Sequence, residues 1–564
     1  MIQLQPLSNA ITSFEEIRRG NAIYVDKTAL FGSFLTSRAP VFISRPRRFG
    51  KSLLCSTLRS FFTHGIEYFK GLELERWWHE QLENVRQDLT GNIVLHLDFS
   101  KMDYDDAAVF KASFKRQLFK SIREVAPDFQ GEDGIEAKDL LDDFLDTMQA
   151  GSVVLLIDEY DAPVSHFLDK PHDLWQVRNT LDNFYRMLKG QAEKLRFFFL
   201  TGVSRVTKIG VFSGFNNVWD LTLSGKYATL LGYTEEELHR YFDPHIRHAA
   251  EILQQTPEEI YLGLKENYDG FRFTYESKAT LHNPWSVLKF LNEPERGFVN
   301  YWYESGGLST AQNSFFARRW QLDLTRLDTN LRCDKDSLQG GMVLNIDDQA
   351  KTITPDYDPT IMLFQAGYLT LKGERRGLGG SLIGYWIGLP NRELRESLFT
   401  TLKGRLEKAL SDTQLADTDK IVEALTEGNL DELSTIFTCY LNSWDYDNST
   451  LTSENACRGL IATWLQASGF EVITEAHSAG GRCDILLTIP EAKLRYAFEF
   501  KVQHQGENSD KRLEDALKQL VENDYGQVPP VSYELKKVGV VIGPDFRSIV
   551  KMAFSWQSSH HQNA

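Results

Sequence analysis

Cysteine is scarce in this chain of 564 residues, and its five cysteines form no metal-binding pattern. There is no CxxC pair and no cluster of cysteine and histidine at the spacing of a zinc site. Few, scattered thiols suit a reducing compartment. The sequence also lacks an apolar run of the ~18 residues that a membrane-spanning helix needs, and its first ten residues lack the basic and apolar parts of a secretory signal. We therefore expect a cytoplasmic protein with no membrane partner.

Basic charge is also in short supply. The chain has 78 acidic and 62 basic side chains, and its formal net charge is -16. Proteins that coat nucleic acid draw their affinity from neutralising phosphates and are normally basic, so a histone-like or coat-like role is excluded. A nucleic-acid enzyme with a local, metal-assisted site stays open. The composition, with 42% hydrophobic and 25% charged residues, excludes a disordered, collagen-like or coiled-coil chain. The length predicts roughly three to four domains.

The first 230 residues alternate short apolar runs with longer amphipathic stretches. Runs that are apolar nearly throughout are typical of parallel strands whose two faces are both covered by helices. Residues 1–230 are therefore predicted to form a doubly wound α/β domain. The expected strands are residues 41–44, 93–98, 153–157 and 197–200, and the expected crossover helices include residues 51–62 and 174–190.

The remaining residues change character twice. Helical patterns dominate residues 231–445, which we predict to be a mostly helical middle region. Residues 451–555 follow the order helix, three strands, helix, strand, with Thr452 or Ser453 as the first helix cap. Polar residues 444–450 suit a linker between the two regions. Inside the middle region the expected helices are residues 234–242, 257–267 and 395–410, and the strand-like pieces are residues 341–344 and 382–386.

A phosphate-binding loop is predicted between the strand at residues 41–44 and the helix that follows it. The sequence Arg45-Pro-Arg47-Arg48-Phe-Gly50-Lys51-Ser52 matches the second half of the pattern G-x-x-x-x-G-K-[S/T]. In that pattern backbone N–H groups and the lysine bind ATP phosphates, and the hydroxyl binds Mg²⁺. Arg45 stands where the first glycine is expected, so the loop departs from the general form.

Two carboxylates end the apolar strand of residues 153–157. Asp158 would hold Mg²⁺, and Glu159 would polarise the attacking water. The alternative is that both cap a turn at a strand end. The next strand, residues 197–200, leads into Thr201, Ser204 and Arg205. Thr201 or Ser204 could read the γ-phosphate and Arg205 could stabilise developing charge, in its own site or in that of a neighbouring subunit of a homo-oligomer. A surface arginine beside a turn is the alternative for Arg205.

These motifs together resemble the bacterial AAA-ATPase-like family whose members carry a C-terminal PD-(D/E)xK nuclease-like domain. The resemblance implies a P-loop ATPase with an AAA-like sheet, and it implies that arginine at the first-glycine position is ordinary for the family. Asn267 to Phe271 and Asn283 to Ser286 are also similar to the family's middle region. The segments that carry the resemblance are YVDKT (24–28), RPRRFGKS (45–52), LIDEYDAP (156–163) and TGVSRVTK (201–208).

A second set of acidic residues lies in the C-terminal strands. Glu499 and Lys501 alternate with Phe498 and Phe500, so the first two share a strand face. Asp484 belongs to the neighbouring strand, and Glu454 begins the preceding helix with a side chain that could point inward. Two or three carboxylates that bind Mg²⁺, with a lysine that orients water or stabilises a pentavalent phosphate, are what phosphodiester hydrolysis needs.

The same residues have a plainer interpretation. Glu-x-Lys on a strand is common as a surface ion pair, and Asp484 after a Gly-Gly turn could simply begin a strand. The order αβββαβ resembles the PD-(D/E)xK core, with Asp484, Glu499 and Lys501 at its signature positions. Cys483 replaces the proline that often precedes the aspartate. This resemblance implies a nuclease fold acting on nucleic acid, although the fold also hosts inactive binders.

The distribution of net charge along the chain supports a nucleic-acid-binding C-terminal region only in part. Residues 451–564 carry a net charge of -2, and the first 450 residues carry -14. Three hypotheses follow from the sequence: an ATPase whose nucleotide state controls a metal-dependent nuclease acting on DNA or RNA; a nucleotide-dependent binding or signalling protein with an inactive nuclease-fold domain; and an ATPase that acts on protein partners.

Overall fold

The computed structural model divides into two compact units, Met1–Phe315 with Asn330–Arg395 and Phe316–Thr329 with Glu396–Ala564. We call them the N-terminal and the C-terminal unit. The finer division at residues 230 and 445–451 stays a prediction. No helix among the described residues combines the length and the apolar character needed to cross a membrane. The structure describes residues 4–9, 11–131, 134–207, 215, 217–304, 331–356, 358–377, 379–398, 418–442, 453–467, 470–478, 481–490, 492–523 and 533–555.

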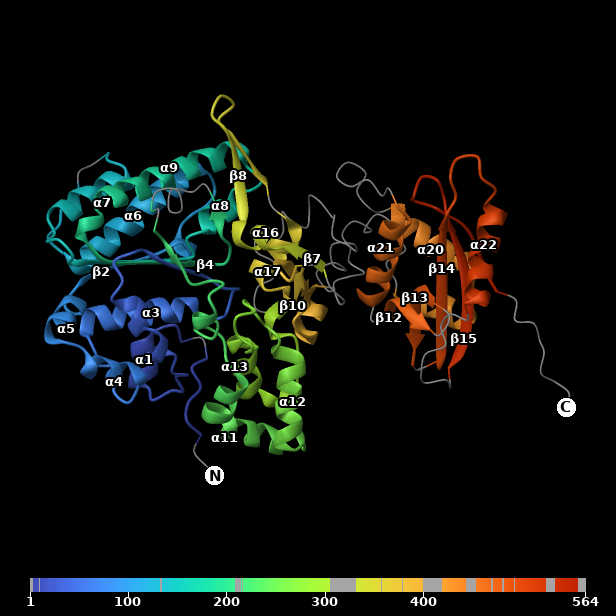
Figure 1. Ribbon diagram of the computed structural model, residues 1–564, viewed down its shortest axis with the longest axis horizontal. Coiled ribbons are helices and arrows are strands. Elements are labelled where there is room, and N and C mark those ends of the chain that lie inside the picture. Colours follow the sequence, from blue (N-terminus) through green and yellow to red (C-terminus); the bar gives the residue numbers. More distant parts are fainter. Residues whose placement is uncertain are drawn as a thin grey trace. The chain divides into compact units, whose positions relative to one another are not determined.

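A five-stranded parallel sheet forms the centre of the first 220 residues. The strands lie in the order β2-β3-β4-β1-β6 and all pairs are parallel. Helices cover both faces: α6, α7 and α9 lie on one side and α3 on the other (Figure 1). This confirms the predicted α/β fold. The bounds are β1 Val41–Ser44, β2 Ile93–Asp98, β3 Val153–Asp158, β4 Leu195–Gly202, β6 Trp219–Asp220, α3 Lys51–His64, α6 Ala107–Val125, α7 Ala137–Asp146 and α9 Pro171–Gly190.

The strand order explains how the two predicted ATP motifs meet. β4 lies between β1, which leads into the phosphate-binding loop, and β3, which ends in Asp158. Because the strands are parallel, their carboxyl ends share one edge of the sheet, where open α/β sheets bind ligands. Strand burial is nearly complete along β1, β3 and β4, as the continuous apolar runs predict.

The middle region is helical in its first half. α11 (Glu235–Leu253) and α12 (Pro257–Tyr268) each begin with a capping box, formed by Thr234 with Glu237 and by Thr256 with Glu259. α13 (Pro284–Asn292) begins at Asn283, whose side chain accepts hydrogen bonds from two backbone N–H groups. These helices bury one shared core that includes Ile23 and Val25 of the N-terminal segment.

The second half of the middle region has more strands than the sequence predicts. The two expected pieces are the strands β8 (Met342–Asp347) and β11 (Leu382–Gly388), which pair with β9 (Thr352–Asp356) and β10 (Thr370–Arg376) respectively. β7 (Leu331–Asp334) completes the sheet β10-β11-β7. Along the chain, α16 (Lys335–Gly340) lies between β7 and β8, and α17 (Pro359–Ala366) lies between β9 and β10. Polar residues on the exposed hairpins weaken the alternation that would have revealed them. The expected helix at residues 395–410 falls mostly outside the described residues.

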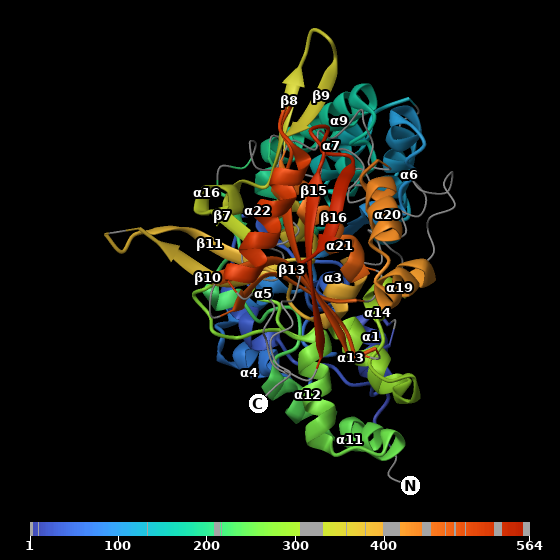
Figure 2. The same cartoon turned by 90° about the vertical axis from the view of Figure 1, so that its right-hand side faces the viewer.

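The C-terminal unit is built on a second five-stranded sheet, of order β12-β13-β14-β15-β16. Only β14 and β15 pair in parallel, and α22 joins them. α20 and α22 flank the sheet on opposite sides (Figure 2). The bounds are α19 Thr418–Glu427, α20 Leu430–Asn442, α21 Glu454–Ala467, β12 Glu471–Ser478, β13 Gly481–Ile489, β14 Leu494–Val502, α22 Ser509–Glu522, β15 Glu534–Ile542 and β16 Ile549–Phe554.

The predicted αβββαβ order is confirmed, with additions at both ends. Tyr496, Phe498 and Phe500 face the core beneath α19, α20 and α21, and Ala497 faces Leu520 of α22, as the alternation predicts. The sequence reading missed α19 and α20, which cover this core, and the edge strand β16. Ser453 caps α21 through its hydroxyl, which accepts from the Ala456 N–H at 3.2 Å. Thr452 and the predicted linker at residues 444–450 lie outside the described residues.

Candidate active sites

The phosphate-binding loop connects β1 to α3 through two residues with positive φ. Gly50, at φ +94°, is the N-cap of α3, and Arg48 has φ +66°. Glycine adopts this region freely, whereas a side chain such as that of Arg48 adds strain of about 1–3 kcal/mol. Strain of this kind is retained where surrounding structure holds the backbone in place. The guanidinium of Arg48 lies 4.2 Å from the centre of the Trp285 ring, which supplies one such restraint.

Aromatic residues of the middle region hold the rest of the loop. Phe49 is buried against Phe271 and Phe273, with ring centres 4.9 and 5.5 Å apart. Gly270, which precedes Phe271, has φ +96°, and a Cβ there would lie 2.3 Å from the carbonyl oxygen of Pro390. These contacts explain the Asn267–Phe271 motif as a clamp on the phosphate-binding loop.

Arg45 also helps to hold the start of the phosphate-binding loop in place. Its guanidinium is 1% exposed and donates to the carbonyl oxygens of Ser44 and Thr222 at 2.9 and 2.8 Å. It also lies 4.3 Å from the centre of the Phe273 ring. Burial lowers the pKa of Arg45 to about 9. The side chain that replaces the first glycine therefore fastens β1 to neighbouring backbone, and Arg45 is absent from the lining of the cavity described below.

Lys51, Ser52, Asp158 and Glu159 meet at the sheet edge, as predicted. The Ser52 hydroxyl donates to Asp158 Oδ2 at 2.6 Å. Lys51 Nζ lies 3.3 Å from Glu159 Oε1 and donates to the Pro46 carbonyl at 3.2 Å. A hydroxyl and a carboxylate are oxygen donors of the kind that Mg²⁺ prefers. The arrangement thus fits a magnesium ion held by Ser52 and Asp158.

The electrostatics of this pair favour a bound cation. Burial, reinforced by the charge of Glu159, raises the pKa of Asp158 to about 6. Glu159 has φ +52°, so its backbone is strained where the strand turns. Its N–H donates to Asp158 Oδ1 at 2.9 Å, which orients the carboxylate. A divalent ion beside Asp158 would replace the missing solvation of that carboxylate.

A cavity of about 730 Å³ opens beside these residues, within the size range of small-molecule sites. The phosphate-binding loop from Arg47 to Ser52 lines one part of it, together with Glu159. Apolar and aromatic side chains line another part, among them Tyr24, Tyr233 and Trp285. A polar end beside an apolar wall suits a molecule that has phosphates at one end and a flat ring at the other.

The predicted residues at the end of β4 and after it have local partners. Thr201 donates to the Ile43 carbonyl at 2.9 Å, and Ser204 donates to the buried carboxylate of Asp161 at 2.5 Å. Arg205 Nη1 lies 2.5 Å from Asp220 Oδ2. None of the three lines the 730 Å³ cavity among the described residues. Asp161 therefore organises this turn. This role was not predicted from the sequence, although the place of Asp161 in the LIDEYDAP motif could have indicated it.

The YVDKT motif connects the N-terminal segment to the middle region. Asp26 accepts hydrogen bonds from Thr28 and from the Glu73 N–H, and Lys27 Nζ pairs with Glu237 of α11 at 2.6 Å. Tyr24 and Lys27 line the cavity. The motif thus ties the N-terminal segment to the middle region at the cavity wall.

In the C-terminal unit, strand register brings the predicted carboxylates together. β13 and β14 pair Ile485 with Phe498, and continuing this antiparallel register sets Asp484 opposite Glu499. Lys501 Nζ donates to Glu499 Oε1 at 2.9 Å. Backbone N–H groups of β14 hold the other two acids: Phe500 donates to Asp484 Oδ2 at 2.8 Å, and Val502 donates to Glu454 Oε2 at 3.1 Å.

This cluster carries the marks of a metal site. Glu499 is 2% exposed, and its Oε2 atom is buried without a hydrogen-bond partner. Burial, and then the charge of Asp484, raise the pKa of Glu499 to about 7. Burial lowers the pKa of Lys501, but Glu499 and the neighbouring acids raise it above its ordinary value overall. An unpartnered carboxylate oxygen beside two further acids fits a divalent cation.

Arg458 also belongs to this acidic cluster, although it was not predicted from the sequence. It lies one turn after Glu454 on α21, and its Nη1 atom is ion-paired with Asp484 Oδ1. The two side chains are 9% and 13% exposed, so the pair is nearly buried. Its spacing of four residues from Glu454 was a usable signal, because residues at i and i+4 share a helix face.

Comparison with known proteins identifies the domains in which the two candidate sites lie. Residues 8–212 match the family model described as predicted AAA-ATPase, and residues 452–552 match that of the PD-(D/E)XK nuclease superfamily. A protein of Azotobacter chroococcum mcd 1, named an uncharacterized protein in the vnfD 5' region, is 28% identical over 559 residues. The match covers 96% of this chain and 97% of that protein, so it spans both units. The chain thus contains an AAA-ATPase-like domain and a C-terminal domain of the PD-(D/E)XK nuclease superfamily.

Proposed function

We propose that this protein binds and hydrolyses ATP in its N-terminal unit and that the nucleotide state controls metal-dependent cleavage of nucleic acid by its C-terminal unit. The observation that carries the nuclease assignment is the buried, unpartnered Glu499 oxygen beside Asp484 and Lys501. The cavity beside Lys51, Ser52, Asp158 and Glu159 supports the ATP assignment.

In the ATP site, the N–H groups of the loop at Gly50, the charge of Lys51 and the side chains of Arg47 and Arg48 bind the phosphates. Ser52 and Asp158 would hold Mg²⁺, which would supply positive charge to the phosphates. Phosphate draws Lys51 away from Glu159, and the freed carboxylate then orients the attacking water. Roles for Arg45 at the phosphates and for Arg205 in catalysis stay predictions, because the contacts of both side chains favour structural roles.

In the nuclease-like site, Glu454, Asp484 and Glu499 would hold the metal, which would supply Lewis acidity for hydrolysis of the scissile phosphodiester. Lys501 remains charged and stabilises the negative charge that accumulates on the phosphate oxygens. For Asp484 to bind the ion, Arg458 has to release Oδ1. Freed Arg458 is then available as a second positive group for the phosphate backbone.

A second candidate function is supported by that same ion pair. If Arg458 never leaves Asp484, the C-terminal domain binds nucleic acid without cutting it, and the protein is a nucleotide-dependent binding or signalling ATPase. An arginine can serve as a permanent internal cation in place of a metal, because it neutralises the same buried carboxylate.

A nuclease assay on the full-length protein separates the two. We expect single- or double-stranded DNA or RNA to be cut with Mg²⁺ or Mn²⁺, at a rate that changes when ATP is added. Asp484→Asn and Lys501→Met should abolish cutting while nucleotide binding persists, and Lys51→Ala should abolish the response to ATP. Asp510→Asn, which removes an exposed acid of α22, is the matched control and should cut normally.

Two outcomes decide against the proposal. If the wild-type protein cuts no substrate in any nucleotide state but binds nucleic acid, the binding alternative replaces it. If Asp484→Asn cuts as well as the wild type, the activity lies outside the site described here. A cytoplasmic location and a homo-oligomeric state stay predictions.

A further inference from the structure

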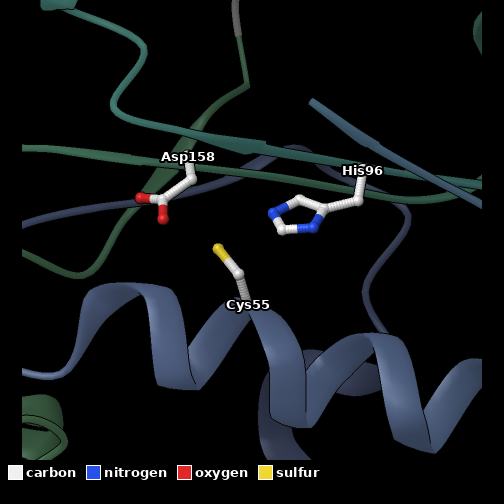
Figure 3. A group of neighbouring side chains, drawn as sticks. All are labelled: Cys55, His96 and Asp158. Carbon is white, nitrogen blue, oxygen red and sulfur yellow. The ribbon is translucent and has the colours of Figure 1, made fainter. Parts of the chain in front are cut away.

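Three side chains behind the phosphate-binding loop face one another, and two of them, Cys55 and His96, have no part in the proposed function. Cys55 comes from α3, His96 from β2 and Asp158 from the end of β3 (Figure 3). One ligand atom from each lies within 4.8 Å of those of the other two. In a tetrahedral site such atoms are somewhat closer, so small side-chain shifts would complete it.

The surroundings leave these groups available. Cys55 is fully buried, and the Nε2 atom of His96 is buried with no hydrogen-bond partner. Neighbouring Asp98 is engaged elsewhere, since it accepts from Ser100 and pairs with Lys101 at 3.1 Å. A buried nitrogen without a partner points to a missing ligand.

We propose that Cys55, His96 and Asp158 form a binding site for a thiophilic divalent metal ion of the Zn²⁺ class. One thiolate, one imidazole and one carboxylate are typical zinc donors, with a water as fourth ligand, whereas Mg²⁺ prefers oxygen donors alone. On binding, the S–H bond of Cys55 breaks, its proton passes to solvent, and the sulfur electron pair forms the bond to the metal.

The site has a consequence for ATP, because it shares Asp158 with the magnesium site. Asp158 Oδ2 now accepts from Ser52 at 2.6 Å and Oδ1 accepts from the Glu159 N–H at 2.9 Å, so a metal at Cys55 would have to draw this carboxylate away from these partners. Zinc bound behind the loop therefore competes with Mg·ATP. The metal site itself is independent of activity, but this inhibitory effect rests on the proposed ATPase function.

The test uses full-length protein freed of metal with a chelator and titrated with Co²⁺ as a spectroscopic probe. We expect a thiolate-to-cobalt charge-transfer band, which oxygen-donor sites such as Asp484 and Glu499 cannot produce, and its displacement by Zn²⁺. Cys55→Ser should remove the band, and His96→Gln should weaken cobalt binding by at least about tenfold. Cys333→Ser, which changes another buried cysteine of the same unit, should retain the band.

The remaining outcomes are distinct. A band that persists in Cys55→Ser, or no band in the wild type, overturns the site. Since Cys55→Ser could fold poorly, circular dichroism is recorded for each variant, and His96→Gln gives an independent reading. If the band behaves as expected and Zn²⁺ lowers ATP turnover of the wild type and of Cys333→Ser but not of Cys55→Ser, competition at Asp158 is supported. If the band behaves as expected and no variant turns over ATP, the metal site stands and the ATPase proposal fails.

Discussion

The nucleotide-binding centre and the nuclease-like centre each contain a carboxylate whose pKa burial has raised, Asp158 and Glu499 respectively, but the aspartates of the two centres have different neighbours. Asp158 is paired with the neutral hydroxyl of Ser52, whereas Asp484 is paired with the cationic guanidinium of Arg458. In each centre a lysine pairs with a glutamate, Lys51 with Glu159 and Lys501 with Glu499. A hydroxyl can itself be a metal ligand, whereas a guanidinium competes with the metal for the carboxylate.

This difference implies that the two centres respond differently to metal ions. At the proposed magnesium site, Ser52 and Asp158 are already hydrogen-bonded to each other, so folding has met the cost of bringing them together. If the nearly buried ion pair of Arg458 with Asp484 breaks, the carboxylate of Asp484 is left as an uncompensated buried charge unless the incoming cation neutralises it. We therefore expect the nuclease-like centre to bind metal more weakly and to be the easier one to regulate.

The largest effect is expected from Glu159→Gln in the nucleotide centre. The amide keeps the shape of the side chain but cannot act as a base, so ATP turnover should fall about 100-fold or more. Phosphate release measures turnover, and a fluorescent ATP analogue checks that binding is retained. Equal turnover in the variant and the wild type would remove Glu159 from the mechanism.

Arg458→Met tests the difference between the centres directly. Without the competing guanidinium, Mn²⁺ should bind the C-terminal site about tenfold more tightly. This gain corresponds to roughly 1.4 kcal/mol of binding free energy. The metal-free variant should be less stable and should recover stability when Mn²⁺ is added. Calorimetric titration, with Asp484→Asn as the blank for this site, gives the affinity.

The matched control for that experiment is Arg512→Met, which removes an arginine paired with Glu507 on the exposed side of α22. Its Mn²⁺ affinity should equal that of the wild type. Weaker binding in Arg458→Met would mean that the arginine supports the metal site rather than competing with it.

Acidity should also separate the two centres. A proton on Glu499, whose pKa burial raises to about 7, competes with a metal ion, so Mn²⁺ affinity should fall up to about tenfold per pH unit as the pH drops below 7. At Asp158 the corresponding loss should begin near pH 6. Titrations at pH 5.5 to 8, done with Asp484→Asn and with Asp158→Asn to isolate each site, follow the two losses. Coincident pH profiles would contradict the assigned acids.

The smallest effects concern the arginines of the phosphate-binding loop. Arg45→Met removes hydrogen bonds to buried carbonyl groups and should destabilise the N-terminal unit by about 1–3 kcal/mol with little change in ATP affinity. Arg47→Met, at an exposed position that lines the cavity, should weaken ATP several-fold with little change in stability. Thermal unfolding and ATP titration of both variants measure this, and the reverse pattern would restore Arg45 as a phosphate ligand.

Much of the fold and the sites could be predicted from local patterns. Continuous apolar runs predicted β1 to β4, because a strand buried on both faces has no polar positions. Alternation along β14 correctly set Glu499 and Lys501 on one face and Phe498 and Phe500 on the other. Of the hairpins β8–β9 and β10–β11, the sequence predicted β8 and β11 but missed β9 and β10, because exposed residues interrupt their alternation.

By itself, the sequence determined which chemical groups are present, which strand or helix carries each, and which face they occupy. Those properties depend on side-chain spacing along one element. Only the tertiary structure decided which groups meet: Arg458 with Asp484, Phe49 with Phe271, and Cys55 with His96 and Asp158. Each of these contacts joins elements far apart in the chain. They depend on strand order, register and helix packing, which no local periodicity encodes.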